Sequence, residues 1–341
     1  MRLLAALLLL LPALAAAVES HAVVFMYHRF GEDRYPSTSV RIDQFEAHLD
    51  WLAGGGYTVW PLERIVQYLE RGEAIPDRTI AITVDDAYAS VYRHAFPRMR
   101  DRGWPFTVFV NTESVDRGLR DYMTWAQMRE MQGHGARFAN HGAGHTALWR
   151  RLPEEDESRW RTRVRQDLEQ AQARLQEELG TQTNTAPALF AFPYGEYTLA
   201  LADYVKELGY VGFGQHSGAI GPLSDRRALP RYPMAEPYAA RDGFATKAAS
   251  LPLPVVAVEP AEPLVRENPP RLDITLAEHG PAPKAVACYL NGRPMRVEVE
   301  ARRLRLQAGA PLPKGRSRYN CTAPAAGGKR FYWFSQPWMV D

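Results

Sequence analysis

The sequence predicts an α/β fold with a parallel sheet and outer helices, followed by a smaller β-rich domain. Short apolar runs alternate with stretches of helical spacing from His21 to about Met234, which is the pattern of repeated βα units. Residues 271–341 instead alternate in strand fashion. We therefore expect a first domain whose sheet is either open or closed into a barrel, and a small β-sandwich after it.

The elements of the first domain follow from local patterns. Expected strands lie at residues 22–26, 57–60, 79–84, 106–110, 137–140, 188–192 and 210–213. Those at 79–84 and 106–110 lack polar alternation, which is typical of strands buried on both faces. Expected helices lie at residues 42–52, 62–69, 154–179 and 199–208. Gly180 ends the longest of these, and its many charges indicate a solvated outer face.

The N-terminus has the three parts of a secretory signal peptide. Arg2 precedes an apolar run at residues 3–14, and three small residues end at Ala17. The run is shorter than the ~20 residues that a bilayer span requires. We expect residues 1–17 to be cleaved near Ala17, and the mature protein to be secreted or periplasmic without a stable membrane span.

Composition sets the remaining boundaries. We assign the first domain to residues 18–250, a linker to residues 251–270, which hold six prolines, and the β-rich domain to residues 271–341.

A net charge of +2 and the lack of a basic run exclude nucleic acid as a partner. In an oxidising compartment, Cys288 and Cys321 predict one disulfide. Two unpaired core cysteines are the alternative.

Asp85 and Asp86 stand at the end of the expected strand 79–84. Strand ends of parallel α/β folds are where functional sites form, and adjacent carboxylates are costly there unless a cation neutralises them. Neighbouring residues point in different directions, so one carboxylate can bind a metal while the other faces a water molecule. An ordinary helix cap with a first-turn acid is the alternative.

His141 and His145 follow the expected strand 137–140 in an H-x-x-x-H pattern. This spacing puts both imidazoles on one side of a helical turn, within reach of one metal ion. Two histidines and one carboxylate with an open position suit Zn²⁺ or another borderline divalent metal. A third signal, Phe192-Pro193-Tyr194-Gly195, ends a strand in a sharp turn that can present a backbone N–H to the site.

In this order, Asp85-Asp86, His141-x-x-x-His145 and Phe192-Pro193-Tyr194-Gly195 resemble the polysaccharide deacetylase family, also called carbohydrate esterase family 4 or NodB-homology domains. The resemblance covers about residues 21–235 and implies a deformed (β/α) barrel. It also implies roles: Asp85 as the general base, Asp86, His141 and His145 as metal ligands, and the Tyr194 N–H as the oxyanion donor.

The sequence departs from the family pattern at specific positions. Ala87 stands where the family usually has glycine, and the usual arginine before the Pro-Tyr turn is missing. Arg231 is our candidate to orient Asp85 in its place. The late L-x-H motif that supplies the family's general acid is also missing.

Two histidines are candidates for that acid. His28 ends the first strand in Met26-Tyr27-His28, which is similar to the branch that includes biofilm poly-N-acetylglucosamine deacetylases. His216 follows the strand 210–213 and is the alternative, as the acid or as a substrate contact. A structural role is the simpler interpretation of either histidine alone.

We therefore predict a metal-dependent hydrolase that removes N-acetyl groups from the amino sugars of an extracellular or cell-envelope polysaccharide. The alternatives are an inactive glycan-binding protein on the same fold, and a metal-dependent amidase or esterase for another acylated substrate. In the β-rich domain, the aromatic residues 331–334 and Trp338 either stack on sugar rings or, more simply, fill the domain's core.

Overall fold

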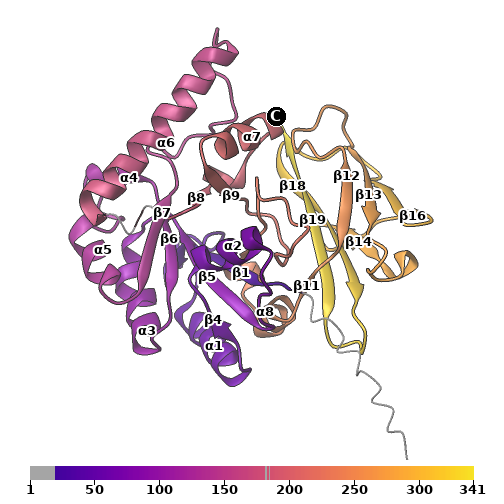
Figure 1. Cartoon of the computed structure of the whole chain (residues 1–341), viewed down its shortest axis with the longest axis horizontal. Helices are drawn as coiled ribbons and strands as arrows, with labels where there is room; N and C mark the ends of the chain where they lie inside the picture. The colour runs from indigo at the N-terminus through magenta and orange to yellow at the C-terminus, as the bar shows by residue number, and fades with distance from the viewer. Residues whose placement is uncertain (1–19, 181–182, 184) are drawn as a thin grey trace, which may run out of the picture.

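The computed structural model describes residues 20–180, 183 and 185–341. The expected signal peptide at residues 1–17 lies outside them. Within the described residues, no helix is both long enough and apolar enough to cross a membrane. Figure 1 shows two parts side by side, a sheet with helices around it and a β-rich part formed by the C-terminal residues.

The first part is built on a parallel sheet of eight strands in the order β10-β1-β5-β6-β7-β8-β9, with β4 beside β5. These strands are β1 (Val23–Tyr27), β4 (Thr58–Val59), β5 (Thr79–Asp85), β6 (Phe106–Val110), β7 (Ala136–Asn140), β8 (Ala188–Ala191), β9 (Tyr210–Phe213) and β10 (Tyr232–Pro233). A separate short pair is formed by β2 (Arg29–Phe30) and β3 (Ser39–Val40).

The segment 229–233 closes this sheet. Leu229 bridges Phe213 of β9 in parallel fashion, and Tyr232 of β10 pairs with Phe25 of β1. The two ends of the sheet are thereby joined through one short segment. The result is the deformed (β/α) barrel that the family resemblance implies, and it places Arg231 in the barrel's interior, where the residue is fully buried.

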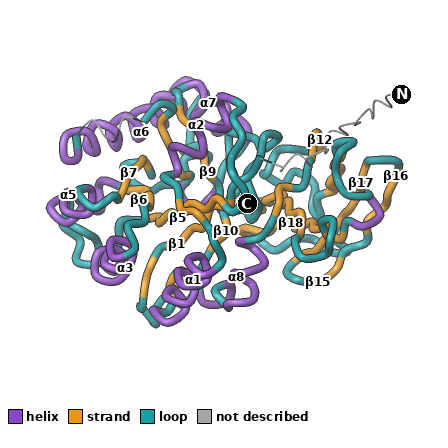
Figure 2. The backbone as a smooth tube through the Cα atoms, turned by 60° about the horizontal axis from the view of Figure 1, so that its bottom comes forward, coloured by secondary structure: helices purple, strands orange, loops and turns teal. Residues whose placement is uncertain are grey.

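Helices surround the barrel (Figures 1 and 2). They are α1 (Ile42–Gly54), α2 (Leu62–Arg71), α3 (Phe96–Asp101), α4 (Thr112–Asp116), α5 (Trp125–Gln132), α6 (Glu157–Leu179), α7 (Leu199–Glu207) and α8 (Arg241–Ala248), with a π-helical turn, η1 (Val91–Ala95), before α3. The longest, α6, begins after Asp156, whose side chain accepts the N–H of Arg159 as an N-cap.

The two faces of each strand pack into different cores. On β5, Ile80, Ile82 and Val84 join the core that packs against α1, α3 and α5, whereas Ala81 joins the core that contains α2. Because side chains alternate along a strand, Thr83 and Asp85 share the face of Ala81. Asp85 therefore points into the barrel, toward Arg231.

Two C-terminal sheets form the second part, with one core between them. One contains β11 (Leu251–Pro252), β14 (Ala287–Leu290), β15 (Arg293–Pro294), β18 (Gly315–Pro324) and β19 (Phe331–Val340). The other contains β12 (Val255–Glu259), β13 (Arg271–Leu276), β16 (Val297–Glu300) and β17 (Arg303–Gln307). Cys288 on β14 and Cys321 on β18 are paired in register and form the expected disulfide.

Three details of this part differ from simple expectations. Within the region expected only to alternate in strand fashion, β16 and β17 form a hairpin that turns at Ala301 with φ 50°. The interval 251–270 holds β11 and β12, which pair with β19 and β13. Of the aromatic residues, Trp338 fills the β-rich core, whereas Trp333 packs against Tyr232 of the barrel at 5.3 Å between ring centroids.

Candidate functional site

A group of potential metal ligands lies where β5 and β7 end. Asp86 directly follows β5, His141 directly follows β7, and His145 lies four residues further on. The Asp86 Oδ1 atom is 3.2 Å from His145 Nε2 and 3.7 Å from His141 Nε2. One ligand atom from each residue lies within 4.8 Å of the others. The sequence predicted this same set.

The unpartnered atoms of this group fit a bound cation. Asp86 Oδ1 and His141 Nε2 are buried, and neither has a hydrogen-bond partner among the described residues. Such atoms are costly in a protein interior unless a ligand satisfies them. The other ring nitrogen of His141, Nδ1, lies 2.7 Å from the Ala191 carbonyl oxygen. Donation by Nδ1–H to this carbonyl leaves the Nε2 lone pair free for a metal ion.

The protein environment keeps His141 available as a neutral ligand. Burial lowers the pKa of His141 to about 4, although the charge of Asp85 opposes this effect. Only a neutral imidazole can bind a metal through its lone pair. The donor set of two imidazoles and one carboxylate, buried and partly unpartnered, therefore suits a borderline divalent cation.

The segment that carries both histidines is a loop and not the helical turn that we expected from their spacing. Asp167 of α6 fixes its shape, because its carboxylate accepts the N–H groups of Ala143 and Gly144, both at 3.1 Å. Gly142, at φ 76°, lies so near that a Cβ atom there would come within 2.5 Å of Asp167. The two histidines converge because α6 holds the loop, which the H-x-x-x-H spacing alone does not reveal.

Two ligand residues have unusual backbone angles. Asp86 has φ 57° and His145 has φ 50°, in the left-handed region that side-chain-bearing residues rarely adopt. Strain of this kind is concentrated at functional sites, where the surrounding structure maintains it. The ring of His145 also lies 4.6 Å from the ring of Tyr194, edge to face.

Asp85 forms a buried ion pair with Arg231. Both side chains are fully buried, and the guanidinium donates from Nη1 to Oδ1 at 2.6 Å and from Nη2 to Oδ2 at 2.8 Å. Arg231 is held in turn by Thr83 Oγ1 at 3.2 Å and the Gly214 carbonyl at 2.9 Å. Burial alone would raise the pKa of Asp85, but Arg231, with smaller effects of His141 and His28, outweighs burial and holds this pKa well below its usual range.

His28 lies in the same site at the end of β1. Burial lowers its pKa, and the charges of Asp85 and Asp86 act in the opposite direction. Weaker effects come from Arg231 and His145. The groups that influence His28 are therefore the members of the candidate metal and carboxylate site.

Tyr194 stands in a one-turn 3-10 helix (η3, Pro193–Gly195) with φ 60° and ψ 1°. The next residue, Gly195 at φ 69°, has no room for a side chain, because a Cβ atom would lie 2.5 Å from that of Gln215. Arg316 of β18 donates to the Tyr194 carbonyl oxygen and to Gln215 Oε1, the latter at 3.2 Å. Gln215 in turn donates to Asp85 Oδ2 at 3.3 Å.

The residues Gln215, Arg316 and Asp167 were not among our sequence candidates. Gln215 and Arg316 link the β-rich part directly to Asp85 and to the Tyr194 turn. Neither belongs to a motif, and more than one hundred positions separate Arg316 from its partners along the chain. A single sequence contains no signal that brings them together.

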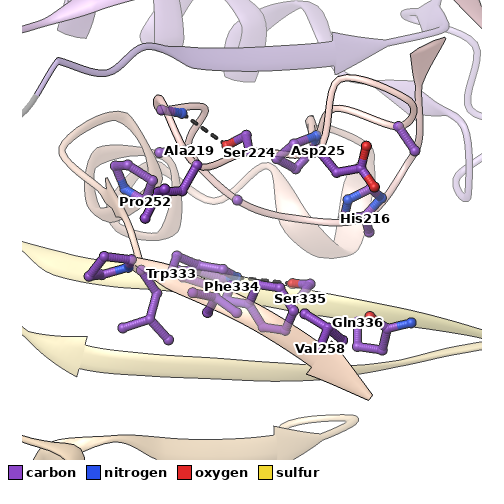
Figure 3. Close-up of a pocket in the computed structure, with 18 of the residues that line it drawn as sticks. His216, Ala219, Ser224, Asp225, Pro252, Val258, Trp333, Phe334, Ser335 and Gln336 are labelled. Carbon is purple, nitrogen blue, oxygen red and sulfur yellow. Dashed lines mark hydrogen bonds between the residues drawn. The ribbon is translucent and has the colours of Figure 1, made fainter. Parts of the chain in front are cut away.

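The structure places His216 in a different environment. It lines a mostly apolar cavity of about 480 Å³ between the barrel and β19, together with Asp225, Pro252 and Trp333 (Figure 3). Its pKa is lowered to about 3, chiefly by burial and then by Arg318 and Arg231. The geometry thus brings seven of the eight sequence candidates together and sets His216 apart.

A family model matches part of the barrel. Residues 72–213 match the family model described as polysaccharide deacetylase. That interval contains Asp85, Asp86, His141, His145 and Tyr194 but not His28 or Arg231.

Two curated relatives illustrate the similarity. The chain is 28% identical to a putative polysaccharide deacetylase of Bacillus subtilis, over 61% of this chain and 69% of the relative. It is 25% identical to the poly-β-1,6-N-acetyl-D-glucosamine N-deacetylase of Escherichia coli, over 57% of this chain. That match spans 33% of the E. coli protein.

Solved structures show the same fold. IcaB from Ammonifex degensii is 25% identical with a TM-score of 0.56, covering 66% of this chain and 96% of that one. The Streptococcus pyogenes deacetylase PplD, solved with acetate, is 20% identical with a TM-score of 0.57, covering 66% of this chain and 97% of that one.

Proposed function

Because the chain belongs to the polysaccharide deacetylase family, we propose that it is a metal-dependent N-deacetylase of amino-sugar polysaccharides, with Asp85, Asp86, His28, His141, His145, Tyr194 and Arg231 as its working residues. The observation that carries the proposal is the buried and unpartnered donor set of Asp86 and His141, directly beside the buried Asp85–Arg231 pair.

Asp86, His141 and His145 would hold the metal ion, and their donor set favours Zn²⁺. Such a cation polarises a carbonyl group and lowers the pKa of a bound water molecule toward ~7. The protein's own residues supply the general base, the oxyanion donor and the general acid.

Asp85 is the proposed general base. Its ion pair with Arg231 keeps the carboxylate ionised and fixes its orientation. In the attack step, a water molecule forms a bond to the acetyl carbonyl carbon while its proton moves to Asp85. The proton then passes from Asp85 to solvent, which restores the carboxylate that Arg231 holds in place.

The Tyr194 turn is the proposed oxyanion site. When water attacks, the carbonyl oxygen acquires the negative charge, and a backbone N–H oriented in advance stabilises that charge. The positive φ of Tyr194 sets the direction of its N–H, and the contact of its ring with His145 places the turn beside the metal ligands.

His28 is the proposed general acid. The carbon–nitrogen bond breaks as the nitrogen takes a proton, so that acetate and a free amine leave. An amine is a poor leaving group without this proton. Burial lowers the pKa of His28, and the charges of Asp85 and Asp86 oppose this shift and so favour the protonated form that the role requires. His216, which lies in the separate cavity of Figure 3, has no part in this mechanism.

The proposed substrate is a polymer that contains N-acetylated amino sugars. The E. coli relative and those from Staphylococcus aureus are named for poly-β-1,6-N-acetyl-D-glucosamine.

We also propose a secreted or periplasmic location, which the Cys288–Cys321 disulfide supports because disulfides persist in oxidising compartments. Since β11 and β12 pair with strands of the β-rich part, we place the start of that domain at residue 251.

Acetate release from N-acetylglucosamine oligomers tests the proposal. It is measured for the Zn²⁺-loaded wild-type protein, for the wild-type protein after a chelator has removed the metal, and for Asp85→Asn. We expect rapid acetate release from the loaded wild-type protein and none from the chelator-treated protein. The rate of acetate release should fall by about a hundredfold or more in Asp85→Asn. If a loaded, folded protein releases no acetate but binds the oligomers, it is a glycan-binding protein. Release only from other acylated substrates would indicate a different amidase or esterase.

A further inference from the structure

Three arginines converge on a cavity of about 390 Å³, which Arg34, Arg93, Arg120 and Asp121 line. The arginines come from separate segments: the loop after β2, the η1 turn, and the loop between α4 and α5. All three side chains are exposed. We call this cavity the arginine subsite.

The charges of this subsite are not balanced within the protein. Arg34 and Arg120 form no ion pair within the part of the chain that the structure describes. Arg93 lies 3.7 Å from Glu32, but that carboxylate is engaged by Arg29 at 2.5 Å. Three guanidinium groups against the one carboxylate of Asp121 leave an excess of two positive charges.

Convergent guanidinium groups are suited to one kind of ligand. Each presents several N–H donors in a planar fork that matches the oxygens of a carboxylate or a phosphate. A concave surface with charges of one sign also concentrates oppositely charged ligands. Without such a ligand the three cations repel one another.

The arginine subsite lies one loop away from the candidate catalytic residues. Tyr88 donates its N–H to the Asp86 carbonyl at 2.7 Å, and Ala89 donates to the Asp121 carbonyl at 2.8 Å. The segment 86–89 therefore runs from a proposed metal ligand to the wall of the cavity. Arg29, the neighbour of His28, stacks on the Tyr88 ring at 3.4 Å and on the Tyr35 ring at 4.1 Å.

We propose that the arginine subsite binds a carboxylate or phosphate group of the same polysaccharide chain whose N-acetyl group reacts at Asp85 and Asp86. The inference rests on the proposed function and narrows its substrate class to acidic amino-sugar polymers. The anionic group belongs to a sugar beyond the one that is deacetylated, because the segment 86–89 separates the two sites.

Kinetics on matched substrates test the subsite. The neutral substrate is an N-acetylglucosamine oligomer. A carboxylate substrate alternates N-acetylglucosamine with glucuronic acid, and a phosphate substrate is the neutral oligomer with a terminal phosphate. We expect kcat/KM on at least one anionic substrate to exceed that on the neutral one by about tenfold at low ionic strength. Added salt should reduce this ratio.

The double variant Arg34→Gln/Arg120→Gln should bring the ratio close to unity, mainly through KM on the anionic substrate. Its control is Arg271→Gln/Arg296→Gln, which removes the same charge from exposed positions of the β-rich part and should keep the wild-type ratio. A wild-type ratio near unity with both anionic substrates, or a double variant that keeps the preference, would overturn the proposal.

A binding experiment separates this proposal from the proposed function. Asp85→Asn, which should not turn substrate over, is titrated calorimetrically with the glucuronic-acid-containing oligosaccharide and with the phosphorylated oligomer. Tighter binding than in Asp85→Asn/Arg34→Gln/Arg120→Gln supports the subsite even if no substrate is deacetylated. Equal binding by both proteins, alongside normal deacetylation of the neutral oligomer, refutes the subsite and leaves the enzyme function standing.

Discussion

Arg231 and Asp85 are joined by two hydrogen bonds of 2.6 and 2.8 Å inside the barrel, where both side chains are fully buried. Arg231 belongs to the segment that closes the barrel, and Asp85 ends a central strand. The pair therefore connects barrel closure to the candidate base. A buried ion pair of this kind is sensitive to the loss of either partner, because the remaining charge is left uncompensated.

We predict that Arg231→Gln lowers the free energy of unfolding by about 3–5 kcal/mol, because it leaves the Asp85 carboxylate buried without its counter-ion. Urea denaturation of wild type and variant measures this difference in the free energy of unfolding. Adding Asp85→Asn to the same variant should recover part of the loss, since the buried charge is then gone. Arg137→Gln, which removes a partly exposed pair with Glu63, is the matched control and should cost at most about 1 kcal/mol. A similar loss in both arginine variants would contradict the prediction.

Asp167 should control metal affinity although it is not a ligand. Its carboxylate orients the loop between His141 and His145 through two backbone hydrogen bonds, and outer contacts of this kind commonly change metal affinity by about 10–100-fold. We predict a loss of Zn²⁺ affinity in this range for Asp167→Ala, measured by competition with a chromogenic chelator.

Asp167→Asn provides the graded comparison. Its amide oxygen can accept one of the two N–H groups, so its affinity should lie between those of wild type and Asp167→Ala. Glu169→Ala, which removes a neighbouring acid of α6, should leave the affinity unchanged. An Asp167→Ala protein that is folded and binds Zn²⁺ as wild type does would show that the loop holds its shape without α6.

The sequence predicted the parts of the site that are carried by strand ends and motifs. Asp85 and Asp86 follow an apolar strand, and His141 follows the next strand but one in the sheet. Parallel strands end at a common edge, so these residues had to meet. Arg231 was also a sequence candidate, on the ground that the usual family arginine is missing. Its segment closes the barrel.

The remaining parts depend on tertiary contacts without a local pattern. The conformation of the loop 141–145 is imposed by Asp167 of α6, so the helical spacing of its histidines was misleading. Arg316 reaches Tyr194 only because the β-rich part packs against the barrel. His216 follows a strand that ends near the site, yet its side chain lies in the cavity beside β19.

Arg316 should influence the reaction through the Tyr194 turn. Its guanidinium contacts both the Tyr194 carbonyl and Gln215, which itself donates to Asp85. We predict that Arg316→Ala lowers kcat for acetate release by about tenfold with a smaller change in KM, because orientation at the reacting group is lost and not substrate binding.

The matched control is Arg305→Ala on β17, an arginine that forms ion pairs within the β-rich part and should leave kcat unchanged. Stability should change by no more than about 0.5–1 kcal/mol in Arg316→Ala, since its side chain is half exposed. An effect confined to KM, or an equal loss of kcat in the control, would argue against a positioning role.

His216 should make the fold sensitive to acid. Its pKa is lowered from 6.5 to about 3, because burial and then the charges of Arg318 and Arg231 disfavour the imidazolium, with Asp225 acting weakly against them. The unfolded chain therefore binds a proton between pH 6.5 and about 3 that the folded chain does not. The contribution of His216 to the free energy of unfolding is fully present above pH 6.5. It is lost progressively as the pH falls from 6.5 to about 3.

Urea midpoints measured across the same window test this for wild type and His216→Gln, whose side chain does not titrate. The variant should lose less stability on acidification than wild type. His279→Gln, which changes another histidine that lines the cavity, is the matched control and should follow the wild-type slope. Parallel slopes for wild type and His216→Gln would mean that His216 is protonated as readily in the folded protein as in the unfolded chain, and that the apolar cavity does not exclude its charge.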